Sequence, residues 1–456
     1  MRKTLWIGLL MLIVSTSTYA GGLLTNTNQH VAFLRMLARG ASTEIDAVYT
    51  NPAGLAFLPK DGWYLSLNIQ NAYQTREIDA TFPLFPEGSR HYKGTASAPV
   101  IPSLQAAYKI GNWTLSGSFA VVGGGGKASF DTGLPMFDAM AMGMINTQLS
   151  PLLAVLPAGT KVSDLYGMNS ALDGKQYIYG IQLGATYKIK DWLSVFVGGR
   201  MNYFTGGYEG FLTATLKAPY QQYVPQAPGG VLANIALDCD QTGWGITPIL
   251  GANLKTGKWN IGLKYEFMAN LNIENKTKKL EVPDGTEAQF KAYQNGVNTP
   301  NDIPALLTAA VGYEFLPTLR ATVEYHHFFD KAAGMAPVVD NGTEVGKQKF
   351  LTHGTHEYLA GVEWDAHRYV TVSAGFQKTD YGLSDKFQSD TSFSCDSYSI
   401  GLGAALNLSS KLKMNVAYFW TTYSDYNKPA ASAASPLAEV YSRTNKVFGV
   451  GVDYRF

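Results

Sequence analysis

The sequence predicts an all-β fold: a 14-stranded antiparallel transmembrane β-barrel, closed on itself, with an N-terminal hatch that plugs the lumen. Three observations lead to this fold. The chain opens with an export signal, apolar and polar residues alternate with period two from about residue 61 to the C-terminus, and short turns alternate with long polar loops. Together they predict a bacterial outer-membrane protein.

The first twenty residues have the layout of a signal peptide. Two basic residues precede an apolar run over residues 5–14, and small residues occupy 15–20. Cleavage after Ala20 would leave a mature chain starting at Gly21. The apolar run is shorter than the roughly 20 residues of a membrane-spanning helix, so we interpret residues 1–20 as a leader that is removed.

The composition favours a β-rich membrane protein. Charged residues make up 16% of the chain, aromatic residues 12%, and glycine occurs 47 times. Of the 36 basic residues two lie in the leader, which leaves 34 against 35 acidic residues, so nothing points to nucleic acid. Beyond the leader no run of 18 apolar residues occurs, which excludes helical membrane spans.

Residues 21–60 lack β alternation and form the predicted hatch. They contain a short apolar stretch with helical spacing, broken by Gly40: Val31, Phe33, Leu34, Met36, Leu37 and Ala38. A free tail of this apolar content should not stay solvated, so we expect it to fold into the lumen. A plug also accounts for charged residues such as Arg200 and Glu266 on inward faces.

Residues 61–456 form the predicted barrel. In the last strand Phe448, Val450, Val452, Tyr454 and Phe456 share one face, while the other face is small or charged. Fourteen such segments start near residues 61, 97, 112, 174, 191, 242, 257, 302, 317, 352, 368, 393, 410 and 443. The even number suits a bacterial barrel, and a soluble β-sandwich would have the opposite polarity, with its apolar faces in one core.

The connections fall into two classes that alternate. Short turns lie at 111–112, 190–191, 256–257, 316–317, 366–367 and 409–410, and long loops at 81–96, 131–173, 214–241, 276–301, 331–351, 380–392 and 425–442. We expect the short turns in the periplasm and the long loops outside the cell. Aromatic residues near the segment ends, such as Trp113 and Trp192, are typical of interfacial girdles in contact with outer-membrane lipid.

One motif stands just before the first strand. Asn51-Pro52-Ala53-Gly54 forms a rigid turn, because Pro52 fixes its own φ and keeps Asn51 out of the helical region. This element resembles the Asn-Pro-Ala motif in the hatch of FadL-type outer-membrane long-chain fatty acid transport proteins. The resemblance covers the mature length, but its specificity rests on this motif and the strand number.

The resemblance implies uptake of fatty acids or other hydrophobic molecules by ligand-gated passive diffusion, with sideways release beside a kinked third strand. Gly123-Gly124-Gly125-Gly126 would be this kink, or else a flexible strand end. The second outer loop, which contains Met140 and Met144, resembles the loop that receives substrate, although its helices could equally pack on themselves. Neither cofactor nor metal is implied, and we expect a monomer.

Candidate ligand contacts are Phe33, Leu37, Met140, Met144, Arg200, Lys264 and Arg320. Each of the three cations could pair with a fatty acid carboxylate, but we favour ion pairs with Glu266, Glu324 or Glu363, because buried charges are usually paired. Cys239 and Cys395 could form a disulfide in an oxidising compartment.

Two other function classes stay open. An outer-membrane lipase or protease would need a nucleophile and a base, yet the histidine pairs 326–327 and 353–356 lack a nucleophile-elbow motif, and His326 and His327 point to opposite faces. An adhesin would bind its partner through the long loops, and a general porin is disfavoured by the hatch.

Overall fold

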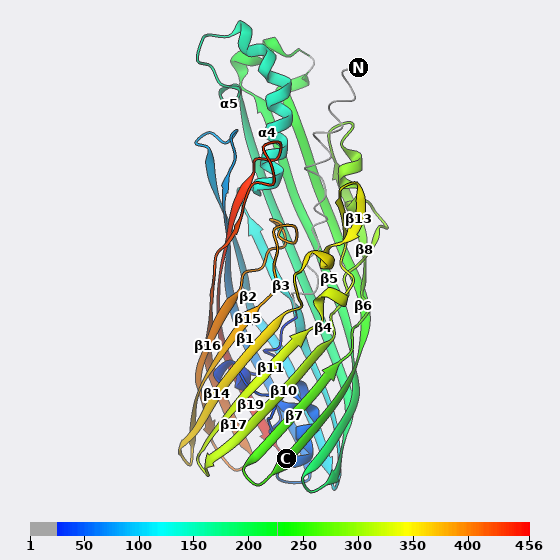
Figure 1. The fold of residues 1–456 in the computed structure, drawn as a ribbon, viewed down its shortest axis with the longest axis vertical. Coiled ribbons are helices and arrows are strands. Elements are labelled where there is room, and N and C mark those ends of the chain that lie inside the picture. Colours follow the sequence, from blue (N-terminus) through cyan, green and yellow to red (C-terminus); the bar gives the residue numbers. More distant parts are fainter. Residues whose placement is uncertain (1–24, 226) are drawn as a thin grey trace.

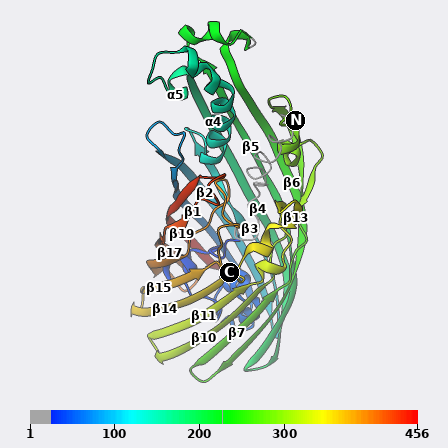
Figure 2. The same ribbon diagram turned by 45° about the horizontal axis from the view of Figure 1, so that its top comes forward.

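The structure is a computed structural model and describes residues 25–225 and 227–456. The predicted leader, its cleavage point and the first hatch residues lie outside the described residues. A sheet of 17 strands contains the 14 that close the barrel, because β1 pairs with both β2 and β19 (Figures 1 and 2). The predicted 14-stranded antiparallel barrel is therefore confirmed.

The barrel strands, in chain order, are β1 (Gly62–Thr81), β2 (Ser89–Ile110), β3 (Trp113–Phe130), β4 (Tyr166–Lys190), β5 (Leu193–Leu216), β6 (Val231–Thr256), β7 (Trp259–Glu266), β10 (Leu306–Leu316), β11 (Leu319–Phe328), β14 (His356–His367), β15 (Val370–Asp380), β16 (Ser397–Asn407), β17 (Leu412–Tyr423) and β19 (Ala438–Arg455). Short strands extend the sheet on the loop side: β8 (Asn272–Glu281), β9 (Asn298–Pro300) and β18 (Tyr426–Lys428). β12 (Pro337–Asp340) and β13 (Thr343–Gly346) form a separate hairpin.

The barrel wall is unequal in height, as Figure 1 shows. β4, β5 and β6 have 25, 24 and 26 residues, whereas β10 and β11 have 11 and 10. About ten residues suffice to cross a membrane, so the tall strands continue well beyond it on the loop side. Four strands therefore begin earlier than predicted, at residues 89, 166, 231 and 438 instead of 97, 174, 242 and 443. Above the membrane the outer face no longer meets lipid, while the inner face packs against α4 in a hydrophobic cluster. The apolar-outward polarity that marks a membrane-spanning strand is therefore lost, although the ladder continues.

The outward face of the wall is apolar around the membrane-spanning part. Leu67, Leu183, Val197 and Trp244 are between 53% and 67% exposed, while inward neighbours such as Ser66 are fully buried. This polarity belongs to a transmembrane barrel, whose outer face meets hydrocarbon. No helix among the described residues is long and apolar enough to span a bilayer.

The hatch fills the end of the lumen nearest the short turns (dark blue in Figure 1). It consists of α2 (Val31–Arg35), α3 (Ala47–Thr50) and the 3-10 helix η1 (Pro52–Phe57). Val31, Leu34 and Leu37 are fully buried against wall residues that include Ala417 and Val447. Apolar packing thus places the hatch inside the barrel.

The outer loops cover the other end. They carry α4 (Pro135–Leu149), η2 (Ser150–Val155), α5 (Val162–Leu165), η3 (Ala218–Tyr223), η4 (Pro228–Gly230), η5 (Glu287–Tyr293), η6 (Asp330–Ala332) and η7 (Lys347–Phe350). The longest of these helices, α4, packs with the tall wall into a hydrophobic cluster that includes Met140, Leu149, Phe130 and Leu212.

Candidate functional site

The Asn-Pro-Ala turn anchors the hatch to the wall where β6 and β7 carry glycines. The Asn51 amide donates to the carbonyls of Gly40 and Ala252 at 3.2 and 3.1 Å. A Cβ on Gly262 would overlap the Gly40 carbonyl and lie 2.7 Å from the Asn51 nitrogen, and one on Gly251 would lie 2.9 Å from the Asn51 oxygen. Only glycine permits this close approach of two backbones.

Wall side chains satisfy hatch carbonyls that regular secondary structure leaves free. Three neutral donors do so from the adjacent strands β4 and β5: Gln182 to Val48, Thr186 to Pro52 and Ser194 to Ala53, at 2.7, 2.7 and 2.6 Å. Buried carbonyls need such partners. The hatch is therefore held by specific polar contacts as well as by packing.

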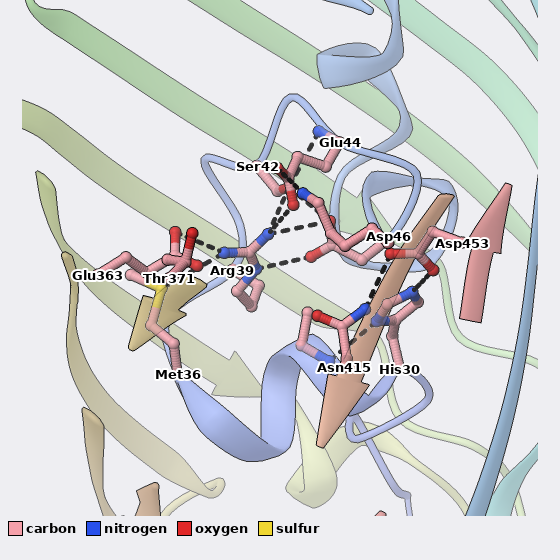
Figure 3. A network of polar contacts seen from close by, with 12 residues as sticks. His30, Met36, Arg39, Ser42, Glu44, Asp46, Glu363, Thr371, Asn415 and Asp453 are labelled. Atoms are coloured by element: carbon pink, nitrogen blue, oxygen red, sulfur yellow. Dashed lines mark hydrogen bonds and ion pairs between the residues drawn. The ribbon is translucent and has the colours of Figure 1, made fainter. Parts of the chain in front are cut away.

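A buried ion network joins the hatch to the opposite wall (Figure 3). Glu363 on β14 accepts from Arg35 and Arg39 of the hatch at 2.5 and 3.0 Å, and from Arg320 on β11 at 2.9 Å. Arg39 also pairs with Asp46 within the hatch at 2.7 Å. The hatch and the wall therefore share one set of balanced charges.

The other two predicted cations also pair at this level. Arg200 and Lys264 both bind Glu266, the latter at 2.6 Å, and both lie over the ring of Tyr49. Lys264 further donates to the Tyr49 carbonyl at 3.1 Å. The structure thus places all three cations, Arg320 included, in ion pairs. A role in ligand binding stays a prediction.

The predicted apolar contacts divide between the two ends of the lumen. Phe33 and Leu37 are buried between the hatch and the wall. Met140 is buried in the cluster around α4, and Met144 packs against that cluster while half-buried. Residues of one predicted ligand set therefore lie in two separate places.

The four-glycine segment lies within β3 and interrupts the sheet. Gly124 and Gly126 have φ values of +100° and +74°, and the register with β4 shifts on both sides of Gly123. On the other side, Ala96 of β2 pairs with Ala128 and Ser103 with Ala120, so that the strands are unpaired between these points. The hatch reaches this gap: the amide of Asn26 donates to the Val122 carbonyl at 2.9 Å. Whether this kink serves release stays a prediction.

A small apolar groove lies under α4. Its volume is about 40 Å³, and its apolar lining includes Leu134, Phe137, Leu172, Leu212, Ile235 and Phe290. The larger hollow of about 460 Å³ opens instead beneath the hatch, with polar residues such as Lys258, Glu314 and Arg368. The apolar surface suited to a hydrophobic molecule is therefore at the outer end.

The suggested disulfide is wrong in this structure, where both cysteines are free and buried. Cys239 on β6 accepts from the Thr277 hydroxyl at 3.3 Å, whereas the Cys395 thiol lies 3.5 Å from the carbonyl of Tyr441 on β19. β6 and β19 are not neighbours in the barrel. The sequence could not show which part of the wall each cysteine meets, and the structure puts the two near different strands.

The histidines that the sequence singles out lie on β11, on β14 and in the loop just before β14. His326 is held between Glu324 and Glu357 at 2.6 and 2.7 Å inside the barrel. Across the described residues there is no group of three histidine, cysteine or acidic side chains that could hold a metal ion.

Glu363 lies at the centre of this ion network, whereas the sequence indicated it only as one possible partner for a cation. Two further residues were not predicted: Asp453, which lies 3.1 Å from His30, and Asn415, which bonds Arg35 and Asp453. Inward parity on the last strands was the signal that could have found them, since each is a polar residue on a face that meets the lumen.

Comparison with solved structures decides the fold type. A Pseudomonas aeruginosa FadL homologue matches with a TM-score of 0.67 and 15% identity, over 96% of this chain and 100% of that one. The chain has the fold of FadL-type channels. The FadL-type fold is shared by the P. putida toluene transporter TodX, with a TM-score of 0.55, 13% identity, and coverage of 91% of this chain and 95% of TodX. It is also shared by the Ralstonia pickettii toluene transporter TbuX, with a TM-score of 0.52, 14% identity, and coverage of 91% and 94%.

No family model and no curated protein matches the sequence. The predicted resemblance is thus confirmed for the FadL-type fold, and the structural neighbours are transport channels rather than enzymes. Sequence identities of 13–15% establish only a shared fold, so the substrate has to be inferred from the residues of this chain.

Proposed function

We propose that this protein is an outer-membrane channel for the uptake of hydrophobic small molecules by passive diffusion. The short turns would face the periplasm and the long loops the cell exterior, as in other outer-membrane barrels. Cargo would enter at the groove under α4, pass into the lumen above the hatch and leave through the wall. The hatch would gate this passage.

The strongest support for this proposal is that the hatch closes the lumen while the wall has an unpaired stretch between β2 and β3. The described hatch residues fill the lumen with buried side chains and a balanced ion network, which disfavours a straight polar pore. The unpaired stretch between β2 and β3 offers a side route at the Gly123–Gly126 segment. A side route ends in lipid, which suits apolar cargo and not water-soluble cargo.

The apolar groove under α4 also supports entry of a hydrophobic molecule from the outer end. Leu134, Leu172 and Phe290 present carbon surface at the outer end, where a hydrophobic molecule would arrive. Such a pocket binds by burying apolar area and discriminates mainly by shape. The solved neighbours include a FadL homologue and toluene transporters, so both long-chain acids and small hydrocarbons are substrate classes to test.

The enzyme and porin alternatives have less support. His326 is locked between two carboxylates, which leaves no free base next to a hydroxyl nucleophile at that place. A general porin needs a water-filled lumen, and the hatch occupies it.

The test is uptake of labelled oleate and labelled toluene by cells that express the barrel. Wild type should exceed a barrel-free strain for at least one of the two compounds. Gly124→Ala should lower that uptake about fivefold or more at equal surface level, because a Cβ there would overlap the Gln176 carbonyl in a backbone conformation that favours glycine. Gly167→Ala on the next strand is the matched control, since a Cβ there meets open space.

Uptake by wild type that does not exceed the barrel-free strain for either compound contradicts the channel proposal. Uptake that Gly124→Ala leaves unchanged contradicts the side route.

A further inference from the structure

The polar hollow beneath the hatch has no part in the proposed route of a hydrophobic molecule. Its volume is about 460 Å³, within the range of roughly 300–1,000 Å³ that is usual for ligand sites. Arg39, Ala41 and Glu44 of the hatch form its inner end, and wall strands from β6 to β17 surround it. A molecule that fills the hollow therefore contacts both the hatch and the wall.

The hollow has more basic than acidic side chains. Six basic and four acidic residues line it. Three of the basic residues have carboxylate partners within the lining: Arg39 and Arg320 with Glu363, and Lys413 with Glu44. Three basic residues take no part in these pairs, so the lining carries a surplus of positive charge.

The surplus lies at the rim of the hollow, on and beside short turns. Lys258 in the β6–β7 turn and Arg368 in the β14–β15 turn are exposed. With Lys255 on β6, they form no ion pair with any residue that the structure describes. Lys258 donates to the Phe315 carbonyl at 3.3 Å, and Arg368 lies over the ring of Tyr369. Neither contact neutralises the positive charge.

The spacing of the rim cations indicates an extended ligand. β7, β10, β11 and β14 are consecutive in the wall, and neighbouring strands lie about 4.8 Å apart, so the turns that carry Lys258 and Arg368 are separated by roughly 15 Å. A single small anion cannot contact both. An extended chain, which rises about 3.3 Å per residue, spans the gap in about five residues.

We propose that this hollow binds an acidic peptide segment of a periplasmic protein, with Lys258 and Arg368 at its rim and Lys413 at its inner end. Complementary charges of this kind give specificity and speed association. The inference goes beyond the channel function at the outer end. It rests on the orientation proposed for the channel, in which the short turns face the periplasm.

Binding at the inner end would loosen the hatch. Lys413 on β17 pairs with Glu44 of the hatch at 2.5 Å, and the two side chains are 27% and 37% exposed. An ion pair that water reaches contributes little stability, so a carboxylate of the bound segment can take the place of Glu44 on Lys413 at small cost. The hatch would then lose one of its contacts with the wall.

The experiment measures binding of a fluorescent peptide of six glutamates to the full-length purified protein in a non-ionic detergent, by fluorescence anisotropy. Wild type should bind it at least about tenfold more tightly than a peptide of six lysines. Lys258→Gln/Arg368→Gln should weaken binding of the glutamate peptide about fivefold or more.

Lys190→Gln/Lys411→Gln is the matched control. Both lysines are exposed beside short turns at the same end of the barrel, and neither lines the hollow. Its affinity for the glutamate peptide should stay within about twofold of wild type, because only general attraction to the charged rim is reduced.

Two further measurements address the contacts inside the hollow. Glu314→Gln removes an exposed acidic residue of the lining and should tighten binding of the glutamate peptide about twofold. Saturating peptide should raise the hydrogen exchange of the amides of residues 41–46 in wild type. It should leave that exchange unchanged in Lys413→Gln, where the pair with Glu44 is already lost.

The outcomes separate this inference from the channel proposal. Equal affinity of wild type for the two peptides, or equal losses in the two double variants, overturns the peptide site. Displacement of the glutamate peptide by inorganic phosphate, at an ionic strength at which chloride does not displace it, overturns the peptide ligand in favour of a small anion. Hydrogen exchange that bound peptide leaves unchanged in wild type overturns the loosening of the hatch.

Transport and peptide binding can fail independently. Transport of oleate or toluene by a wild type that does not bind the peptide overturns this inference and leaves the channel proposal standing. Peptide binding without transport of either compound overturns the channel proposal and leaves the peptide site.

Discussion

The two levels of the lumen use arginine in opposite ways. At the hatch, three arginines converge on Glu363 and a fourth pairs with Glu266, so that charges from the plug and the wall balance. Above the hatch, Arg76 and Arg443 face each other, and neither forms an ion pair with a carboxylate of the residues that the structure describes. Ion pairs between plug and wall hold the hatch in place, whereas the two facing arginines above it contribute no such pair.

The glycines that face the hatch and the glycines of the β3 kink also have opposite effects on packing. Gly251 and Gly262 let the hatch approach the wall closely, because any side chain there would collide with Asn51 or Gly40. Gly124 and Gly126 instead break the ladder between β3 and its neighbours. Gly251 and Gly262 thus allow the hatch to pack closely against the wall, whereas Gly124 and Gly126 interrupt the pairing of the wall itself.

The largest expected effect comes from Glu363→Gln. Three arginines would lose their common counter-charge, two of them buried, and breaking a buried ion pair typically costs about 3–5 kcal/mol. Equilibrium urea unfolding in detergent should show this loss. Glu314→Gln is the control, since Glu314 is exposed at the same end of the barrel. A loss no greater than that of the control would mean that the ion network does not hold the hatch.

Gly262→Ala should be next. The new methyl would overlap the Gly40 carbonyl, and overpacking of this kind costs about 1–3 kcal/mol. Because the hatch can yield more easily than the wall, we expect the hatch to shift and the ion conductance of reconstituted barrels to rise. Conductance that matches Gly167→Ala would show that the hatch tolerates the change.

Asn51→Ala should have a smaller effect. It removes two hydrogen bonds and leaves the carbonyls of Gly40 and Ala252 without this donor, at a cost of about 1–2 kcal/mol. Hydrogen exchange of the hatch amides should increase while that of the strands stays constant. Equal increases in both would indicate general destabilisation instead of a local anchor.

The smallest effect concerns pH and the outer loops. Burial, together with nearby Lys428, lowers the pKa of Lys347 to about 7. The unfolded state binds the extra proton between pH 7 and about 10.5, so loop stability falls as pH decreases through this window and levels off below pH 7. Protection of residues 337–350 from hydrogen exchange should therefore be greater at pH 9 than at pH 6.

Lys347→Met should remove this pH dependence, and Lys349→Met, which changes an exposed neighbour, should keep it. A pH dependence that survives in Lys347→Met would assign it to another group.

Periodicity predicted most of the fold. The membrane-spanning alternation located fourteen strands, and the apolar stretch after residue 30 located the hatch, because lipid on one side and lumen on the other impose opposite chemistry on alternate residues. The starts of β2, β4, β6 and β19 were missed, since above the membrane the outward face is no longer the apolar one.

The site was less predictable, because strand alternation shows whether a side chain points into the barrel but not which residue it contacts there. Arg200, Lys264 and Arg320 were placed inward correctly, yet only the register of the closed barrel brings Arg76 opposite Arg443, almost the whole chain apart in sequence. The disulfide prediction failed for the same reason, because the sequence does not show that Cys239 and Cys395 lie near different strands of the wall.

The most direct test of the account is a crystal structure of the wild-type barrel with a fatty acid brominated along its tail. Anomalous scattering would locate the bromine atoms independently of the protein density. Bromine is expected near Leu134 and Leu172, in the groove under α4. Ligand bound only in the polar hollow beneath the hatch, or no ligand at saturating concentration, would contradict it.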